Sequence, residues 1–304
     1  MAPEPFDVHE RTVFITGAAR GIGAATAERL HARGANVALV GLEPERLEAL
    51  AARLGDRAAW FQTDVTDADA LQRAVDGTVQ RFGGIDVAIA NAGLAFVGSL
   101  AHSPAEQIER TLAVNLLGVW RTDRAVLEQI VARRGYLLNV ASLAAAAHTP
   151  LMGAYAASKA GVEALSDSLR QELRPSGARV GCAYFGFIDT DLVRASFAHP
   201  ATEAVQRLMP AFIRRPAPLS AAIDAIDAGV QRRAARVRAP RYLGAALALR
   251  GVMQPLFELR TVRGPMLPEA LALADGLDAS GERSDANLGV SGAAAAPRSD
   301  FGRE

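Results

Sequence analysis

The sequence is poor in residues that would mark several common classes of protein. Cys182 is the only cysteine among 304 residues, so an intrachain disulfide is excluded and a thiolate metal site is not expected. Basic and acidic residues number 33 each, which gives no reason to expect a nucleic-acid partner. The first ten residues are polar and predict no signal peptide. These features favour a cytoplasmic protein.

Histidine is also scarce and scattered. Its spacing is not that of metal ligands, so we expect no bound metal. The five histidines are predicted to lie on the surface or in loops: His9, His31, His102, His148 and His199.

Lysine is nearly absent, and the one exception is informative. Lys159 is the single lysine among the 33 basic residues, and it follows Tyr155 by four positions. This spacing places phenol and ammonium on one face of a helix. Ser142 lies thirteen residues before the tyrosine. Lysine is a compact cation with three steerable donors, whereas arginine is a bulkier planar fork that does not release a proton. The pattern indicates a role specific to lysine, although an ordinary exposed helical pair would give the same five residues.

A lysine beside a tyrosine has a chemical use. A free tyrosine has a pKa of about 10, and lowering it to about 7 requires roughly 4 kcal/mol in favour of the phenolate. A cation about 5 Å away, at an effective dielectric constant of about 20, contributes roughly 3 kcal/mol. A second positive charge nearby would supply the remainder. Tyr155 would then act as a general acid and base near neutral pH.

A glycine-rich turn follows the first expected strand, at 12–16. Gly17, Gly21 and Gly23 come next, and alanine-rich helical sequence continues from there. Glycine lets backbone N–H groups approach a ligand closely, and a helix N-terminus favours an anion. The arrangement predicts a phosphate-binding loop. Its spacing differs from the usual Gly-x-Gly-x-x-Gly, and a purely structural turn would also need glycines.

Strand and helix patterns alternate along the chain. Further strands are expected at 36–40, 58–62, 85–90, 136–140, 179–185 and 236–239. Helices are expected at 43–54, 67–82, 104–132 and 153–173. Apolar strands separated by long helices indicate an α/β fold, with a doubly wound parallel sheet covered on both faces. Ligands bind such sheets at the carboxyl ends of the strands. Small and polar residues stand at those ends: Gly17, Gly41, Asp64, Asn91, Ala92, Gly93, Ser142 and Gly186.

In their order and spacing these motifs resemble the classical short-chain dehydrogenases/reductases, over about residues 10–240. Thr16-Gly17-x-x-x-Gly21-Ile22-Gly23 is similar to the family's cofactor motif, and Asn91-Ala92-Gly93 to the motif that stabilises its central sheet. Asp64 is similar to its adenine-ring contact. The catalytic tetrad of the family is matched by Asn115, Ser142, Tyr155 and Lys159. The resemblance implies a Rossmann-type fold.

The resemblance also implies roles for the tetrad. Tyr155 would exchange a proton with the substrate oxygen while hydride moves between the nicotinamide C4 and the substrate carbon, and Ser142 would hold that oxygen. Lys159 would bind the nicotinamide ribose hydroxyls and lower the tyrosine pKa. Asn115 would hold a water that links Lys159 to solvent. The implied function is an NAD(P)-dependent enzyme that interconverts a secondary alcohol and a ketone or aldehyde. The alternative is a catalytically silent, dinucleotide-binding redox sensor or scaffold, which would need neither the tyrosine nor the serine.

Within this resemblance, a few residues affect the choice of cofactor. Relatives that prefer NAD usually carry an acid at the end of the second strand, where this chain has Gly41. Arg20 could pair with a 2′-phosphate, as in relatives that prefer NADP. Glu43 could reach a 2′-hydroxyl and would repel a phosphate. We favour NADP, with NAD as the alternative.

The chain departs from the family after the sixth strand. Phe185-Gly186-Phe187-Ile188-Asp189-Thr190 stands where a proline-glycine pair is usual. Ile188 and Thr190 keep their places, which implies contacts with the carboxamide and the pyrophosphate of the cofactor. Bulky side chains after the strand favour a small to medium apolar or lipid-like substrate. The residues expected to form apolar walls are Phe185, Phe187, Phe197, Met209, Phe212, Met253 and Phe257.

The dehydrogenase-like domain is expected to cover 1–240. A helical extension is predicted for 241–277, and 278–304 has the composition of a disordered tail. From Arg241 to Arg260 apolar residues recur every three or four positions, which predicts an amphipathic helix kinked or ended near Pro255. This helix would pack on its own domain or a partner subunit, or make a peripheral membrane contact. We expect it to border the substrate entrance.

The resemblance implies an oligomer as well. The predicted helices 104–132 and 153–173 would form the face of a homodimer, as they do in the family. A homotetramer is the alternative. The expected partner in catalysis is a small apolar molecule.

Overall fold

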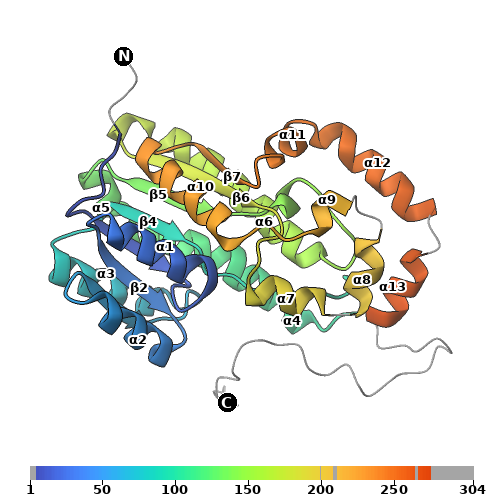
Figure 1. The fold of residues 1–304 in the computed structure, drawn as a ribbon, viewed down its shortest axis with the longest axis horizontal. Coiled ribbons are helices and arrows are strands. Elements are labelled where there is room, and N and C mark those ends of the chain that lie inside the picture. The colour runs from blue at the N-terminus through green and yellow to red at the C-terminus, as the bar shows by residue number, and fades with distance from the viewer. Residues whose placement is uncertain (1–4, 199, 208–210, 264–265, 275–304) are drawn as a thin grey trace, which may run out of the picture.

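A computed structural model gives the structure of the chain and describes residues 5–198, 200–207, 211–263 and 266–274. Seven strands form one parallel sheet in the order β3-β2-β1-β4-β5-β6-β7 (Figure 1). They are β1 (Thr12–Thr16), β2 (Asn36–Gly41), β3 (Ala58–Gln62), β4 (Val87–Ala90), β5 (Tyr136–Val140), β6 (Arg179–Phe185) and β7 (Arg236–Ala239). The predicted α/β fold with a doubly wound parallel sheet is confirmed. All seven predicted strands are present, although β4 begins two residues later than expected.

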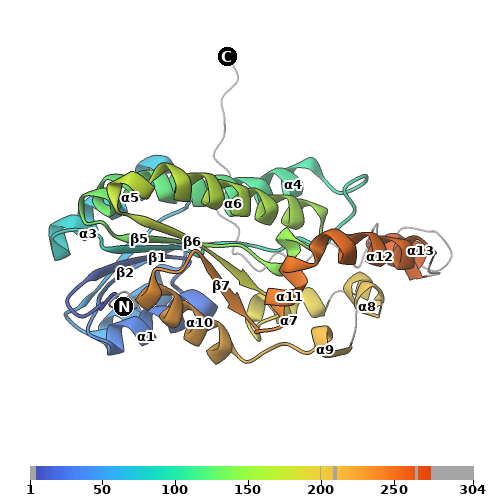
Figure 2. The ribbon, with the colours of Figure 1, turned by 90° about the horizontal axis from the view of Figure 1, so that it is seen from above.

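Helices cover both faces of the sheet, as Figure 2 shows edge-on. One face packs against α1 (Gly21–Ala32), α2 (Pro44–Leu54) and α10 (Leu219–Arg232). The other packs against α3 (Ala68–Phe82), α5 (Gly118–Ala132) and α6 (Gly153–Glu172). Because both faces are buried, the strands are apolar along most of their length rather than alternating.

Local sequence signals explain where these helices start and stop. The side chain of Asp67 accepts a hydrogen bond from the Ala70 N–H at 2.9 Å and caps α3. Gly83 ends the same helix in the left-handed conformation, which glycine adopts without a steric cost. Pro44 occupies the first position of α2, where its missing N–H removes no helical bond.

The single helix predicted over 104–132 is interrupted. The chain forms α4 (Ala105–Leu112), then a π-helical turn at Ala113–Leu117, and only then α5. Asn115 lies in this turn with its side chain fully buried and bonded to the backbone of Leu94. These bonds accompany the local departure from regular α-helix, and such π-turns are often found at functional sites.

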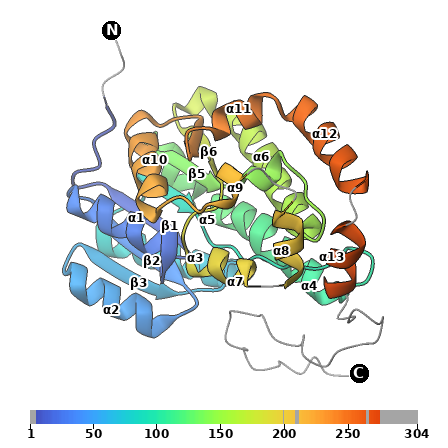
Figure 3. The same cartoon turned by 45° about the vertical axis from the view of Figure 1, so that its right-hand side comes forward.

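Shorter helices follow β6 and β7. The segment after β6 forms α7 (Asp191–Phe197), α8 (Pro200–Gln206) and α9 (Ala211–Arg214). The segment after β7 forms α11 (Leu243–Ala248), α12 (Arg250–Arg263) and α13 (Met266–Ala274). Figure 3 shows this C-terminal extension curving around the end of the molecule that carries α8 and α9. Residues 278–304, predicted as a tail, lie outside the described residues, and the division of the chain near residue 240 remains a prediction.

A helix from Arg241 to Arg260, kinked or ended near Pro255, was predicted, but the helix does not end there. The break falls at Leu249, and α12 continues through Pro255. A proline inside a helix leaves the carbonyl four residues earlier without its partner, and here that residue is the exposed Gly251. Water can satisfy the carbonyl at such a position, so the helix tolerates the proline. No helix among the described residues has the length and apolar character needed to span a bilayer.

Candidate active site

The glycine loop between β1 and α1 is closely packed at Gly17 and Gly23 and less closely at Gly21. Gly17 has a φ of +66°, and a Cβ there would lie 2.9 Å from the Cα of Ala92. A Cβ on Gly23 would lie 2.2 Å from the carbonyl oxygen of Gly17. Gly21 has a φ of +57°, and a Cβ there would meet nothing nearer than the Thr190 methyl group at 3.8 Å. Gly17 and Gly23 are therefore required by packing. Gly21 is favoured by its left-handed backbone conformation, and a Cβ there would make only ordinary van der Waals contact.

The N-terminus of α1 lies at Gly21, which is partly exposed. No side chain caps it, since Arg20 occupies the N-cap position without a capping hydrogen bond. The first N–H groups of a helix have no helical partner and carry a partial positive charge, which suits a phosphate. Ile22, in the first turn, is partly buried and packs against the core. The loop fits the pyrophosphate of a dinucleotide.

Asn91 and Ala92 hold the loop from the neighbouring strand. The Asn91 side-chain amide donates to the carbonyl oxygens of Thr16 at 3.0 Å and Gly17 at 3.2 Å. The N–H groups of Asn91 and Ala92 both donate to the Thr16 hydroxyl, at 3.1 and 3.2 Å. These bonds tie the carboxyl ends of β1 and β4 together. The Asn91 side chain thus stabilises the junction between these two strands.

Asp64 follows β3. Its Oδ1 accepts hydrogen bonds from the N–H and the hydroxyl of Thr66, both at 2.8 Å. This turn fixes the carboxylate just beyond the carboxyl end of β3. The adenine contact implied by the family resemblance remains a prediction.

Arg20 and Glu43 face each other beside the loop. Their side chains form an ion pair of 3.1 Å, and Arg46 approaches the other oxygen of Glu43 at 3.5 Å. Gly41, at the end of β2, places no charge in this region. The arginine expected to meet a 2′-phosphate is therefore already paired with the acid that would repel one.

Ile188 and Thr190 approach the loop from the opposite side. Ile188 is buried and forms an isolated bridge with Ala217. The Thr190 hydroxyl caps α7 by accepting from the Val193 N–H at 3.4 Å, while its methyl group faces Gly21. The Thr190 side chain thus lies beside the glycine loop, and the cofactor contacts of Ile188 and Thr190 remain predictions.

Ser142, Tyr155 and Lys159 come together at the end of β5 and the start of α6. The Ser142 hydroxyl accepts from the Ala144 N–H at 3.2 Å and donates to the Phe185 carbonyl at 3.4 Å. Burial raises the pKa of Tyr155, and a hydrogen bond with Ser142 acts in the opposite direction. The serine therefore lies within hydrogen-bonding reach of the phenol.

Lys159 is buried beneath the tyrosine. Its Nζ lies 5.7 Å from the centre of the Tyr155 ring and donates to the Val140 carbonyl at 2.8 Å. Burial lowers the pKa of Lys159 to about 8. The expected lowering of the Tyr155 pKa is not seen in the protein alone, because desolvation disfavours the phenolate as well as the ammonium. A positive charge added at the site would have to overcome this desolvation.

Gly93 and Asn115 complete the surroundings of the lysine. A Cβ on Gly93 would lie 3.2 Å from the Asn115 Oδ1 and 3.6 Å from the Lys159 Nζ. The Asn115 amide donates to the Leu94 carbonyl at 2.9 Å and to the Ser158 hydroxyl at 3.2 Å. Its Oδ1 accepts from the Leu94 N–H at 2.8 Å. The Asn115 side chain is thus bonded to protein through both ends, and its role in holding a water remains a prediction.

The apolar residues expected around the substrate separate into several groups. Phe187 and Phe197 meet edge to face, with ring centres 4.8 Å apart. Phe185 is instead buried in the core. Met253 is 44% exposed on α12, so the expectation that it forms a pocket wall is wrong. Phe257 is partly buried. The side chains of Met209 and Phe212 lie outside the described residues.

The C-terminal extension reaches the loop between Ser142 and Tyr155, through contacts that the sequence did not reveal. The Gln254 side chain on α12 accepts from the His148 N–H at 2.9 Å and donates to the His148 carbonyl at 3.2 Å. Leu151, in the same loop, is buried against Ala201 of α8 and Ala270 of α13. The extension therefore borders the site. Sequence periodicity could indicate a packed helix but not its partner.

No group of three or more metal-ligating side chains is found in the described part of the chain.

Comparisons with known proteins agree with this geometry. The family model for short chain dehydrogenases matches residues 11–201. Nodulation protein G of Rhizobium meliloti (strain 1021) is 36% identical over 186 residues, which are 61% of this chain and 76% of that protein. D-threitol dehydrogenase of Mycolicibacterium smegmatis is 36% identical over 209 residues, or 67% of this chain and 80% of that protein. A 3-alpha-(or 20-beta)-hydroxysteroid dehydrogenase of Mycobacterium tuberculosis is 35% identical over 183 residues, which are 60% of this chain and 70% of that protein.

A solved structure shares the fold. It is a short chain dehydrogenase/reductase from Burkholderia phymatum in complex with NAD, with a TM-score of 0.69 and 23% identity. The match covers 83% of this chain and 96% of that one. The chain belongs to the short-chain dehydrogenase/reductase family and is an NAD(P)-dependent oxidoreductase that acts on CH–OH groups.

Proposed function

We propose that the protein interconverts a secondary alcohol and a ketone or aldehyde on a small to medium apolar or lipid-like molecule. The observation that carries the proposal is the placement of Tyr155 between the Ser142 hydroxyl and the buried ammonium of Lys159. This group lies at the carboxyl ends of β5 and β6, where parallel sheets bind ligands.

Each residue of the group has a distinct role in this proposal. Tyr155 gives a proton to the substrate oxygen during reduction and takes it back during oxidation. Ser142 donates to the same oxygen, which stabilises the charge that develops there because the donor is already in place. The bound nicotinamide supplies or accepts the hydride. Lys159 donates to the Val140 carbonyl, and its remaining donors would bind the ribose hydroxyls of the cofactor.

The remaining predicted contacts concern binding. The loop residues Gly17, Gly21, Ile22 and Gly23 would hold the pyrophosphate together with Thr190. Ile188 would contact the carboxamide, and Asp64 the adenine. Asn91, Ala92 and Gly93 would shape the loop and leave room beside Lys159. These assignments are supported by the partial exposure of Gly21 and by the start of α1, which no side chain caps.

NADP is proposed as the preferred form of the cofactor. Support comes from the lack of an acid at Gly41 and from the cation Arg20 inside the glycine loop. The ion pair with Glu43 weakens the preference, because a 2′-phosphate must displace this carboxylate from the arginine. We therefore propose a modest preference.

An apolar substrate is supported by the edge-to-face pair of Phe187 and Phe197 after β6. Each buried CH₂ group contributes about 0.8 kcal/mol, or roughly fourfold in affinity. A series of methyl ketones of increasing chain length should show rising kcat/KM with NADPH. Replacing Phe187 with alanine should flatten the rise for the longer ketones while the shortest is reduced at a similar rate. Equal losses at all lengths would reject the apolar wall, and binding of NADPH without turnover of any ketone or alcohol would reject the enzyme proposal.

A homodimer is proposed for the assembly. Leu117 and Trp120, at the start of α5, are 42% and 45% exposed although both are large and apolar. Such residues are expected at a protein interface rather than in water. Light scattering should give a dimer or tetramer, and Trp120→Ser should shift the mass toward a monomer.

The single cysteine, Cys182, is buried and free, which supports a cytoplasmic location.

A further inference from the structure

The outward side of α12 is unusually apolar. Six large apolar side chains between residues 249 and 262 are 44–75% exposed, and they make up more than half of the eleven such residues in the described chain. They recur every one to three positions. The five in α12 lie on one side of the helix, and Leu249, just before its first residue, extends this side. The six residues are Leu249, Val252, Met253, Leu256, Leu259 and Val262.

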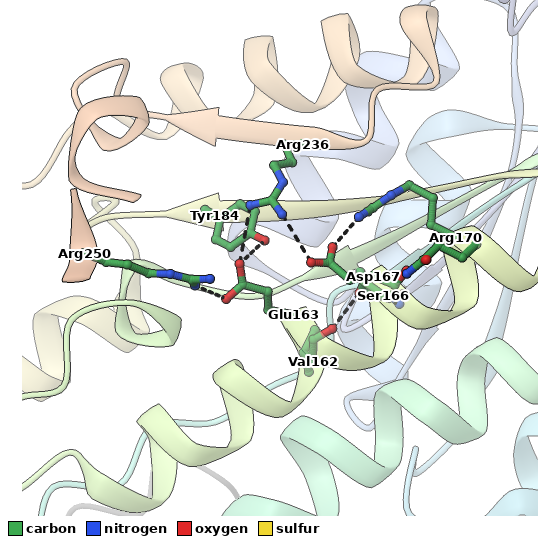
Figure 4. Close-up of polar contacts among 10 residues, drawn as sticks. Val162, Glu163, Ser166, Asp167, Arg170, Tyr184, Arg236 and Arg250 are labelled. Atoms are coloured by element: carbon green, nitrogen blue, oxygen red, sulfur yellow. Dashed lines mark hydrogen bonds and ion pairs between the residues drawn. The ribbon is translucent and has the colours of Figure 1, made fainter. Parts of the chain in front are cut away.

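The inward side of α12 makes polar contacts with the rest of the protein. Arg250 donates to the buried carboxylate of Glu163 at 2.7 Å, and Arg236 and Tyr184 bind the other oxygen of that carboxylate (Figure 4). One turn later, Gln254 makes its two hydrogen bonds to the backbone of His148. These polar contacts fix the rotation of the helix. The apolar side cannot turn inward without breaking them.

Cations accompany the apolar side. Residues 241–263 contain four arginines and one acid, whereas the whole chain has a formal net charge of zero. Arg260 and Arg263 follow Leu256 by four and seven positions, so they share its side of the helix. Both are exposed, and neither has an ion-pair partner among the described residues. Glu258, the one acid, accepts a hydrogen bond from Gln254.

We propose that the outward side of α12, defined by Leu249, Val252, Met253, Leu256, Leu259 and Val262 with Arg260 and Arg263, binds the surface of an anionic lipid membrane. The apolar side chains would enter the boundary between headgroups and acyl chains, and the two arginines would meet lipid phosphates. The helix would lie in the plane of the surface.

A lipid surface fits this side of α12 better than a second copy of the chain. The helix has 14 residues, or two heptads, and a stable coiled coil needs three or four. A symmetric pairing would also bring the two unpaired arginines of each copy together with no acid on this side to meet them. A membrane offers both the apolar and the anionic component.

Membrane binding would place the catalytic site near lipid. The contact between Gln254 and His148 joins α12 to the loop that runs from Ser142 to Tyr155. A molecule leaving the bilayer would thus need to travel only a short way to the catalytic group. Membrane binding itself does not depend on the proposed substrate class, so the two can fail separately.

Co-sedimentation of the full chain with lipid vesicles tests the proposal. The protein should bind vesicles of phosphatidylcholine with 30% phosphatidylglycerol, bind pure phosphatidylcholine more weakly, and lose affinity as salt rises. The triple variant V252S/L256S/L259S should lower the partition onto anionic vesicles at least tenfold. All three side chains are exposed, so the variant should keep its melting temperature and its reduction of a short soluble ketone. Leu100→Ser, at a site that is 63% exposed elsewhere on the surface, is the matched control and should bind like wild type.

The arginines have their own test. R260Q/R263Q should weaken binding to anionic vesicles by roughly an order of magnitude and leave the weak binding to phosphatidylcholine unchanged. R73Q/R81Q removes the same charge from exposed positions on α3 and should have little effect. The proposal is overturned if wild type fails to bind anionic vesicles or if the triple variant binds as well as wild type. A fall in oligomer mass on light scattering of the triple variant, without vesicle binding by wild type, would also overturn it and identify an interface between copies.

Discussion

Helices α6 and α12 both depart from the usual pattern of apolar inside and charged outside, but in opposite senses. Near its start α6 buries two charged side chains, Lys159 and Glu163, one turn apart. In α12 the large apolar side chains are exposed, with Val262 at 75%. Burying a charge is costly unless it is paired or bonded, and exposing a continuous apolar strip is rare in a protein that meets only water. The burial of Lys159 agrees with the acid–base role proposed for α6, and the exposed strip agrees with the surface contact proposed for α12.

The two helices are linked through one of the buried charges. Arg250 at the start of α12 pairs with Glu163 of α6, which stands four residues after Lys159 (Figure 4). The same carboxylate accepts a hydrogen bond from the Tyr184 hydroxyl at 2.9 Å. The buried carboxylate of Glu163 thus holds the C-terminal extension against α6.

The largest effect is expected at Lys159. Replacing it with arginine keeps a positive charge but forces a bulkier, planar group into a site that is 3% exposed. We expect kcat to fall by about a hundredfold or more, because the larger guanidinium cannot take the position of the ammonium beside Tyr155. Steady-state rates with NADPH and a short ketone measure this, with melting temperature as a check on folding. Near-wild-type activity of Lys159→Arg would show that the site needs charge alone.

A second buried charge offers a comparison without a catalytic role. Asp123 of α5 accepts from the Asn139 amide at 2.8 Å, and burial raises its pKa to about 7. The folded state then binds a proton more tightly than the unfolded state, whose aspartate has a pKa of about 3.9. Stability should therefore fall as pH rises from about 4 to about 7, and stay low above that range.

Asp123→Asn should remove this loss of stability. At pH 8 it should raise the free energy of unfolding by a few kcal/mol, with a smaller gain near pH 4. Urea unfolding at several pH values measures the difference. Asp69→Asn, at an exposed position on α3, serves as the control and should be neutral at every pH. A pH-independent difference for Asp123→Asn would show that the carboxyl is not protonated on folding.

The link between α6 and α12 should have a smaller effect. Arg250→Gln removes one partner of Glu163 but leaves Arg236 and Tyr184 in place. We therefore expect the free energy of unfolding to fall by at most about 2 kcal/mol. Hydrogen exchange should rise in α12 and α13 and stay unchanged in the central strands. Arg236→Gln is the comparison, since it leaves the extension fastened by Arg250. Equal exchange in both variants would mean that Arg250 does not hold the extension.

The smallest effect concerns the cofactor. Glu43→Gln frees Arg20 from its ion pair and should raise the preference for NADPH over NADH by less than about tenfold. Arg20→Ala should lower the same ratio of kcat/KM values. Arg53, which is paired with Glu28 at a more exposed site, provides a control through Arg53→Ala. An NADH preference that does not respond to Arg20 would reject the NADP proposal.

The sheet and the glycine loop could be predicted because their constraints act within short stretches. Strand runs such as Val87–Ala90 are apolar throughout, and Gly17 is required where a Cβ would meet Ala92, just after β4. The π-turn at Asn115 could not be predicted, since it accompanies bonds to Leu94, 21 residues earlier. The contact of Gln254 with His148 spans 106 residues and leaves no local pattern.

The chemistry of the site shows a similar division. The spacing of Tyr155 and Lys159 predicted their shared helical face, and the structure brings them together. The lowering of the Tyr155 pKa, ascribed to Lys159 together with a second positive charge, remains a prediction, because in the protein alone burial raises this pKa. Met253 was expected inward from its apolar character, but the polar contacts of Arg250 and Gln254 turn it outward.

The proposed proton transfer is tested most directly by the activity and cofactor affinity of Tyr155→Phe, measured on one preparation. The change removes the proton that the phenol exchanges and leaves Ser142, Lys159 and the glycine loop in place. Turnover of the best ketone should fall by about 10²–10⁴-fold, while the dissociation constant for NADPH, from fluorescence titration, should change by no more than a few-fold. Turnover close to that of wild type, with cofactor binding intact, would contradict the assignment of Tyr155 as the proton donor and acceptor.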